Sequence, residues 1–455
     1  MTLRKEARQT LILAFPIILG ELAQMALQII DTAMVGAVNY KQLAAVALVT
    51  NIMNIPFVFG IGITMSVSQT VSMAHGRKDK NLVSHYLYNG FWLCVIFALI
   101  ISFGLEAGKN ILFHLDQDPE VARLGLPYLR LMGWSILPMM LFLALKQFTD
   151  GLELTRVGMI LSLMALPLNA FLNWLLIFGN GGFPRLEIAG AGWGTLITRS
   201  FMFLVIAIVV LKHSLFKEYI TVRKKHWYLQ WSTFRELLHI GIPSSFQISM
   251  EAGAFAVSGI LIGTLSAVSL AAHQIALSLA SLTFMVSMGI SQAASIRTSN
   301  AFGIKNWHKI SAIGKSAIIT ALLYGTICAV TFIVLRRQLP VLFNNNKEVI
   351  AVAAWLLLFA AVFQISDSTQ AISAGLLRGI KDMKMPTFLI AIAYWVVGIP
   401  TGCLLAFYFN MGAAGIWTGL IAGLTFSAVF LSLRFRKRTT QERQEIFQYN
   451  KKSHH

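Results

Sequence analysis

The 455-residue sequence contains few charged residues and very few acidic ones. Charged side chains make up 12% of the chain, and Asp and Glu together number 19. A soluble domain carries roughly twice that charged fraction. Hydrophobic residues make up 56% of the chain, the mean hydropathy is +0.68, and apolar runs long enough to cross a hydrocarbon core recur throughout. The composition therefore excludes a soluble protein and predicts a polytopic membrane protein surrounded by the lipid bilayer.

Motifs of several other function classes are also missing. The three cysteines all fall inside apolar runs, which favours packing over a disulfide or metal role. No P-loop is present, so ATP is not expected as the direct energy source. We find no convergent nucleophile or metal set, and we expect neither an enzyme nor a cofactor. The net charge of +18 lies in short connections between apolar runs, which indicates membrane topology rather than nucleic-acid binding.

The apolar runs predict an all-α fold with twelve transmembrane helices. Helices are required because an open strand would leave backbone groups without hydrogen bonds in lipid. We place them at about 11–37, 43–73, 86–107, 121–148, 157–178, 189–211, 234–263, 267–298, 312–334, 349–377, 387–409 and 413–434.

Lys and Arg are concentrated in every second connection, as at 77–80 and 305–309, and in the C-terminal tail. The positive-inside rule then places both termini in the cytoplasm. The connections on the opposite side hold few basic residues, most of which are Lys41, Lys109, Arg185, Arg336, Arg337 and Lys347.

The two halves of the chain are copies of each other. A shift of 227 residues places Pro16 on Pro243 and Gly62 on Gly289, and a shift of 228 places Gly151 on Gly379. We therefore predict two six-helix bundles, at residues 1–220 and 221–455. Six is an even number, so both copies enter the membrane in the same direction, and a pseudo-two-fold axis along the membrane normal should relate them. The two matched prolines should kink the first helix of each bundle.

Polar side chains at membrane depth are the candidate functional residues, because each is costly in lipid unless it meets a partner or a wet cavity. A polar stripe follows one face of the helix at 11–37, formed by Glu21, Gln24, Gln28 and Asp31. The helix at 157–178 carries Asn169 and Asn173, four residues apart. Asp31 and these asparagines would provide hard oxygen ligands for a small cation or a proton. Alternatively, the asparagines only join helices through hydrogen bonds.

The second half carries Glu251 in the helix at 234–263 and Asp367 in the helix at 349–377. An unpaired buried carboxylate can serve as a proton carrier or a cation ligand. The alternative is an ion pair with an intramembrane base, although most of these bases lie near predicted helix ends, where they can reach the interface: Lys146, Arg199, Arg297 and Arg378. His273, next to Gln274, is a weaker candidate and is equally consistent with a hydrogen-bonded core histidine.

These residues, in their order, resemble the multidrug and toxic compound extrusion (MATE) transporters, and within them the NorM-like bacterial branch. The matching segments span nearly the whole chain: 16–36 with Ile30-Asp31-Thr32, 167–179, Met250-Glu251, 272–277, 364–368, Leu377-Arg378-Gly379 and Lys381-Asp382. The resemblance implies a multi-pass protein of the bacterial inner membrane that alternates between inward- and outward-open forms. It implies export of small cationic or zwitterionic amphipathic drugs in exchange for inward Na+ or H+. We expect a monomer.

The resemblance also implies two coupling sites, either of which is a candidate Na+ site. One would comprise Asp31, Asn169 and Asn173, and the other Glu251 and Asp367. Phe363 stands where a tyrosine is expected, which removes a hydroxyl ligand, and Glu21 stands where a neutral glutamine is expected. Weaker candidates for the substrate cavity are Glu21, Gln24, Gln28, His273, Gln274 and Phe363. The alternative function is a lipid-linked oligosaccharide flippase of the same wider superfamily, although the mid-membrane charges are mainly acidic.

Overall fold

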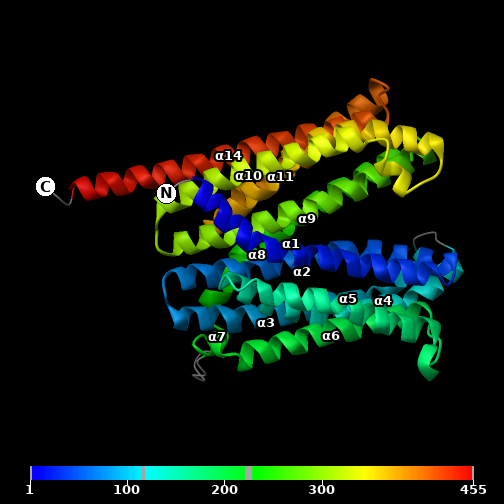
Figure 1. The fold of residues 1–455 in the computed structure, drawn as a ribbon, viewed down its shortest axis with the longest axis horizontal. Helices are drawn as coiled ribbons and strands as arrows, with labels where there is room; N and C mark the ends of the chain where they lie inside the picture. Colours follow the sequence, from blue (N-terminus) through cyan, green and yellow to red (C-terminus); the bar gives the residue numbers. More distant parts are fainter. Residues whose placement is uncertain (1–2, 115–117, 221–227, 453–455) are drawn as a thin grey trace. The chain divides into compact units, whose positions relative to one another are not determined.

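The computed structural model describes residues 3–114, 118–220 and 228–452 (Figure 1). These described residues are helical without any strand, so the all-α prediction is confirmed. They include twelve helical spans long and apolar enough to cross a membrane, as predicted. The spans are α1 (Leu3–Gly36), α2 (Tyr40–Gly76), α3 (Lys80–Ala107), α4 (Pro119–Gly151), α5 (Arg156–Phe178), α6 (Ile188–Lys212), α8 (Trp231–Gly263), α9 (Ala267–Gly303), α10 (Trp307–Leu335), α11 (Lys347–Gly379), a composite span and α14 (Ala413–Lys452).

The composite span changes helix type along its length. It runs through α12 (Lys384–Ala391), the π-helical turn η5 (Ile392–Gly398), α13 (Ile399–Cys403) and a second π-helical turn, η6 (Leu404–Tyr408). Short helical turns also lie in the connections, at η1 (Lys109–His114), η2 (Asn180–Gly182), α7 (Ser214–Lys217) and η4 (Leu339–Leu342). π-Helical turns are rare and are frequently found at functional sites.

Several helices extend beyond the predicted apolar runs. α1 begins at Leu3 rather than at 11, and α14 continues to Lys452 rather than ending at 434. These predicted ends are wrong because hydropathy marks the apolar part of a helix, whereas polar helix-forming residues continue the same helix beyond it. Local caps decide other ends. Asp79 accepts a hydrogen bond from the Leu82 backbone nitrogen before α3, and Gly179 adopts φ 73° after α5.

Residues Leu19–Ser245 form one compact unit, called here the N-terminal unit. In it α4 packs against α2, α3 and α6, and α5 packs against α6 (Figure 1). Buried apolar side chains such as Ile136, Phe142 and Phe148 fill the space around α4. Polar residues near the end of α4 are therefore surrounded by protein rather than by lipid.

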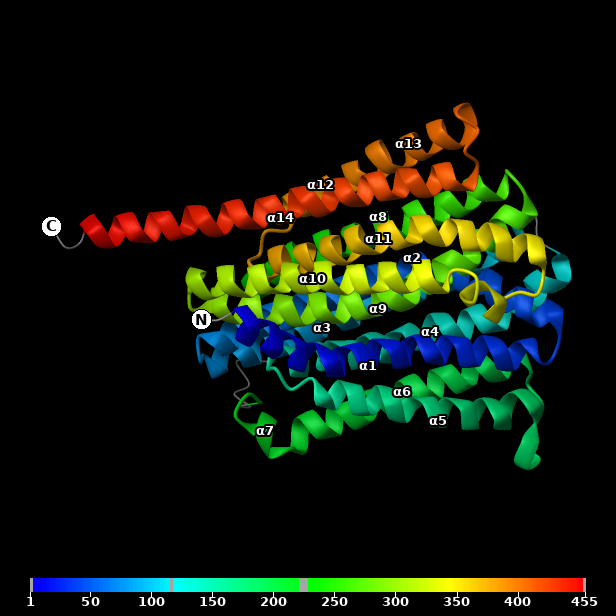
Figure 2. The same ribbon diagram turned by 45° about the horizontal axis from the view of Figure 1, so that its top comes forward.

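The second compact unit comprises the chain up to Ile18 and from Phe246 onward, and is called here the C-terminal unit. In it α11 packs against α9, α10 and α14, and the composite span packs against α14 (Figure 2). Trp417 and Tyr394 are among its largest fully buried side chains. α11 is thus enclosed by other helices along much of its length, in the same way as α4 in the N-terminal unit.

The two compact units divide inside helices. The predicted boundary of 220/221 adjoins residues 221–227, which lie outside the described part of the chain, and it stays a prediction. One division follows Ile18 in α1 and the other follows Ser245 in α8, each two residues after a matched proline. The Ser245 hydroxyl donates to the Phe59 carbonyl oxygen at 2.6 Å within the N-terminal unit. The duplication identifies equivalent residues, but it does not reveal in which unit the first turns of each copy are packed.

Candidate functional site

Asp31 lies in a compact polar cluster of the N-terminal unit and is 6% exposed. The Asn173 amide nitrogen on α5 donates to Asp31 Oδ1 at 2.6 Å, and the Thr195 hydroxyl on α6 donates to Oδ2 at 2.8 Å. The same Asn173 nitrogen lies 3.3 Å from Asn169 Oδ1, one turn earlier on α5. The structure thus brings together the three predicted residues of this half and adds a hydroxyl that was not predicted.

One oxygen in this cluster lacks a donor. Asn173 is fully buried, and its Oδ1 has no hydrogen-bond partner among the residues that the structure describes. The oxygen faces Gly194 on α6, where even a methyl group would collide with it. An unpaired buried acceptor is energetically unfavourable, so this oxygen is available to a cation or another donor that enters the cluster. The asparagines also join α5 to α1, so the structural interpretation and the ligand interpretation are compatible.

The rest of the polar stripe on α1 has several environments. Glu21 is joined to Lys146 Nζ on α4 at 3.1 Å, and Lys146 also lies 3.6 Å from Asp150. Lys146 is 3% exposed, so the expectation that it reaches the interface is wrong, because α4 is enclosed by other helices. Gln24 donates to the Ser162 hydroxyl at 3.3 Å, whereas Gln28 is exposed. Glu21, whose side chain is 36% exposed, therefore joins the buried Lys146 and Asp150 in a charge cluster separate from that of Asp31.

Glu251 lies in a polar cluster of the C-terminal unit. The Tyr394 hydroxyl donates to Glu251 Oε1 at 2.9 Å, and the Gln370 amide nitrogen lies 3.3 Å from both of these oxygens. The Ser427 hydroxyl on α14 in turn donates to Gln370 Oε1. Four segments, α8, α11, η5 and α14, thus contribute to one hydrogen-bonded chain around a carboxylate.

Asp367 lies one turn before Gln370 on α11 and is 2% exposed. It accepts no hydrogen bond from a described residue, and neither Asp367 nor Glu251 forms an ion pair within the described ranges. The alternative that these acids are paired with intramembrane bases is therefore wrong. Phe363, one turn before Asp367, is buried against Phe255 and Trp417, with ring centroids 5.9 Å and 5.5 Å apart.

His273 and Gln274 point into different surroundings. His273 is fully buried, and its ring centroid lies 5.8 Å from that of Trp417. Neither of its ring nitrogens has a hydrogen-bond partner among the described residues, which disagrees with one of the two interpretations, that of a hydrogen-bonded core histidine. Gln274 is exposed. The structure thus places only His273 near the aromatic side chains that surround Phe363.

Sequence reasoning missed Thr195, Gln370 and Tyr394. Gln370 follows Asp367 by three residues, so the same helical spacing that related Asp31 to Gln28 could have found it. Thr195 and Tyr394 lie on other helices, and no spacing within one helix points to them. Their positions depend on how the helices pack.

Oxygen atoms dominate both clusters. Within the described residues, no group of three or more His, Cys, Asp and Glu side chains could hold a metal ion. Carboxylate, amide and hydroxyl oxygens suit hard cations, and carboxylates also bind protons. The two clusters therefore fit an alkali cation or a proton better than a transition metal.

Comparisons with known proteins agree with this architecture. The MatE family model matches residues 16–175 and 243–404. The chain is 35% identical over 442 residues to a probable multidrug resistance protein NorM from Mesorhizobium japonicum, covering 96% of this chain and 94% of the relative. It is 34% identical over 451 residues to the multidrug resistance protein MdtK from Edwardsiella ictaluri, covering 98% of each.

Solved structures show the same fold. A crystal structure of MATE in a bent conformation matches with a TM-score of 0.89 at 18% identity, covering 97% of this chain and 98% of that one. The eukaryotic MATE transporter AtDTX14 matches with a TM-score of 0.85 at 21% identity, covering 98% and 99%. From the family match, the relatives and the twelve spans, the chain belongs to the MATE family of multi-pass membrane transporters.

Proposed function

We propose that this protein exports amphipathic organic cations in exchange for inward-moving Na+ or H+ by alternating access. Two bacterial relatives of nearly the same length carry the name multidrug resistance protein, which supports efflux as the activity. The names of those relatives say only multidrug resistance, so the direction of transport and the class of drug in this proposal come from the resemblance of the sequence to the family. The coupling to an inward ion comes from the buried acidic clusters.

The observation that carries the coupling proposal is the unsatisfied cluster around Asp31. A carboxylate with two neutral donors lies beside the Asn173 amide oxygen, which has no donor. Arg199 attracts Asp31 by Coulomb interaction but forms no ion pair with it in the described part of the chain. Burying a carboxylate that no cation contacts directly is costly, and so is burying an acceptor without a donor. A Na+ ion could relieve both costs by binding the oxygens, and a proton could relieve the first.

In the proposed exchange, the ion and the organic cation compete for the same negative charge. An ionised carboxylate attracts an organic cation through Coulomb interaction in a region of low dielectric. Binding of Na+ or H+ removes that net charge and lowers the affinity for the organic cation. The ion must also bind one conformation more tightly than the other, because a ligand with equal affinity for both shifts no equilibrium. Glu251 and Asp367 provide a second place where the same competition can occur.

The test is efflux of a fluorescent organic cation, such as ethidium, from proteoliposomes under an imposed Na+ gradient or an imposed proton gradient. Asp31→Asn keeps the size and the polarity of the side chain but removes its charge. We expect this variant to slow gradient-driven efflux by at least about tenfold, equivalent to about 1.4 kcal/mol. Asp367→Asn tests the second cluster in the same way.

Glu445→Gln is the matched control, because it removes one carboxylate from an exposed position near the end of α14. It should leave efflux unchanged. If neither gradient moves any organic cation with the wild-type protein, the drug proposal fails, and lipid-linked oligosaccharides become the substrates to test. If efflux is driven by a gradient but Asp31→Asn and Asp367→Asn both retain it, the exporter proposal stands and the coupling assignment is wrong.

A further inference from the structure

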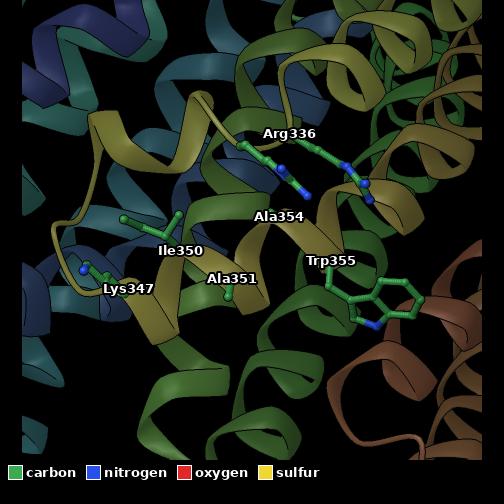
Figure 3. A pocket seen from close by; sticks show the side chains of 7 residues that line it. Arg336, Lys347, Ile350, Ala351, Ala354 and Trp355 are labelled. Carbon is green, nitrogen blue, oxygen red and sulfur yellow. The ribbon is translucent and has the colours of Figure 1, made fainter.

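Three basic side chains gather around one cavity of the C-terminal unit, in the connection between α10 and α11. Arg336 and Arg337 follow the end of α10, and Lys347 begins α11. Together with the first turns of α11 they line a cavity of about 420 Å³ (Figure 3). The other lining residues that matter here are Ala351, Ala354 and Trp355. No acidic side chain lines this cavity.

None of the three cations forms an ion pair with any residue in the described part of the chain. Arg336 is half-buried, so part of its side chain is already removed from solvent. Repulsion between close like charges disfavours such an arrangement unless an anion is bound.

The duplicated half provides an internal comparison. Lys109, at the end of the corresponding third helix, falls on Arg336 at a shift of 227 and on Arg337 at 228. There Glu106 binds Lys109 at 2.8 Å and Arg130 at 3.0 Å. The residues equivalent to Glu106 are Ile333 and Val334. At the position of Glu106 the second copy thus has an apolar residue, and the acid that it does have at this end, Glu348 in the first turn of α11, forms no ion pair within the described residues.

The position of the cavity relates it to the membrane. Nine spans precede the connection, so it lies on the membrane face opposite the N-terminus. The positive-inside rule disfavours basic residues on that face. Of the six basic residues named above for its connections, three belong to this one connection. Membrane topology therefore does not explain why these basic residues are concentrated at one cavity, whereas an anion bound there would.

The shape of the lining favours a partner with an apolar chain. Lys347, Ala351, Ala354 and Trp355 lie on one face of the first turns of α11 (Figure 3). The small alanine side chains leave space along the helix between the basic end and the tryptophan. Trp355 is 56% exposed, and exposed tryptophans of membrane helices are enriched at the headgroup level. The N-terminal end of α11 adds partial positive charge beside Lys347.

We propose that this cavity binds the phosphate headgroup of an anionic phospholipid from the leaflet opposite the two termini. Arg336, which lies beside Ala354 and Trp355 in Figure 3, and its neighbour Arg337 contact the phosphate. One acyl chain lies along Ala351 and Ala354, and Lys347 adds positive charge at the other end of the lining. Arginine suits this role because its planar guanidinium can bind two phosphate oxygens at once. The bound lipid takes the place that Glu106 has in the other half, that of the counter-charge.

The test is isothermal titration calorimetry of the full chain in neutral detergent with short-chain phosphatidylglycerol, and separately with phosphatidylcholine of the same chain length. The wild type should bind phosphatidylglycerol at least about tenfold more tightly, because each basic residue near a headgroup contributes about 1 kcal/mol, or about fivefold. The triple variant Arg336→Gln, Arg337→Gln, Lys347→Gln should lose this preference. The control Lys109→Gln, Arg130→Gln, which removes two charges from the matching end of the N-terminal unit, should keep it.

Two further arms separate a lipid from a soluble anion. Ala354→Leu fills the space for the acyl chain and should weaken phosphatidylglycerol binding several-fold while the cations remain. Inorganic phosphate should displace the lipid only weakly. If inorganic phosphate binds as tightly as the lipid and Ala354→Leu has no effect, the cavity is a site for soluble anions and the lipid proposal is wrong. If the triple variant retains the preference, the lipid binds elsewhere and the proposal is also wrong.

Discussion

The N-terminal and C-terminal units each enclose acidic residues, but they surround them differently. In the N-terminal unit, Asp31 accepts hydrogen bonds from an amide and a hydroxyl, at 2.6 Å and 2.8 Å. In the C-terminal unit, Glu251 accepts hydrogen bonds from Tyr394 and Gln370, while Asp367 accepts none from a described residue. The N-terminal unit also joins a buried acid, Asp150, and the partly exposed Glu21 to the buried Lys146, whereas the C-terminal unit has a buried ion pair between Glu6 and Arg297.

The difference originates in the sequence of the two copies. At a shift of 227, Asp31 falls on Ser258, whose hydroxyl merely donates to the Ala254 carbonyl of its own helix. At a shift of 228, Asp367 falls on Met139. The duplication therefore produced matching helices, while each copy placed its acids independently. Two similar scaffolds with different acidic clusters can bind ions with different affinities, and the following variants test that difference.

Lys146→Met should have the largest effect, which is to lower the stability of the protein. It removes the cation next to Asp150, which is 1% exposed, and next to Glu21. Breaking a buried ion pair by removing one partner costs about 3–5 kcal/mol, because the other charge is left uncompensated. We expect a clear drop in the thermal unfolding midpoint in detergent. The C-terminal unit has no equivalent lysine, since Lys146 falls on Ala374.

Lys41→Met is the matched control for Lys146→Met. Lys41 also pairs with a glutamate, Glu120, but both side chains are partly or largely exposed. An exposed pair contributes about 0–1 kcal/mol. If the thermal unfolding midpoint of Lys146→Met is as high as that of Lys41→Met, the interpretation that Lys146 stabilises the protein by compensating Asp150 and Glu21 is wrong. Adding Asp150→Asn to Lys146→Met should restore part of the lost stability.

Gly194→Ala should have the next largest effect, which is to weaken ion binding in the N-terminal unit. The added methyl group would collide with Asn173 Oδ1 and displace the free oxygen of the Asp31 cluster. Overpacking of this kind costs about 1–3 kcal/mol. We expect the Na+ or H+ concentration that gives half-maximal coupled efflux to rise about tenfold. Gly104→Ala in α3, where a methyl group meets nothing within 4 Å, should leave it unchanged.

Tyr394→Phe should have a smaller effect, limited to the C-terminal unit. It removes the hydroxyl that donates to Glu251 at 2.9 Å but keeps the ring. Loss of one such hydrogen bond costs about 1 kcal/mol, or about fivefold in ion affinity. Tyr86→Phe is the control, because it removes a hydroxyl-to-carboxylate bond to Glu236 elsewhere, at 2.7 Å. Equal effects of the two variants on ion-dependent efflux would contradict a role for the Glu251 cluster.

Phe363→Tyr should have the smallest effect and would sharpen the comparison. It restores the hydroxyl that the family pattern predicts one turn before Asp367, the acid that accepts no hydrogen bond from a described residue. We expect the potency of Na+ in driving efflux to rise about two- to threefold, a few tenths of a kcal/mol. Phe359→Tyr, one turn earlier, controls for the added hydroxyl. A fall in Na+ potency with Phe363→Tyr would show that the packing against Trp417 matters more than the hydroxyl.

Much of the fold follows from the sequence, because the rules of the bilayer are strict. Apolar length predicts the spans, and the matched residues of the two copies predict the repeat. The sequence does not reveal where the polar ends of the helices stop, or which of the two units encloses the first turns of a helix. Glu6 illustrates this, because it precedes the predicted first helix yet lies buried in the C-terminal unit against Arg297.

The candidate sites were predictable only in part, for a related reason. Spacing along one helix identifies a polar stripe such as Glu21 to Asp31. It does not identify partners on other helices, such as Thr195 or Tyr394. It also placed Lys146 near the interface, although packing of α4 encloses it. Cross-helix partners depend on rotation and register, which the hydropathy of a single chain does not determine.

The most direct measurement of the central claim is equilibrium binding of tetraphenylphosphonium to the purified protein. It would be titrated with NaCl against choline chloride at fixed ionic strength, and separately with pH in the absence of Na+. The account predicts that Na+ or H+ displaces the organic cation from the wild type. It also predicts that Asp31→Asn binds the probe more weakly, because the attracting charge is gone, and that its remaining binding responds much less to the ion. Displacement that is identical in wild type and Asp31→Asn, or absent from the wild type, would contradict ion coupling through the Asp31 cluster.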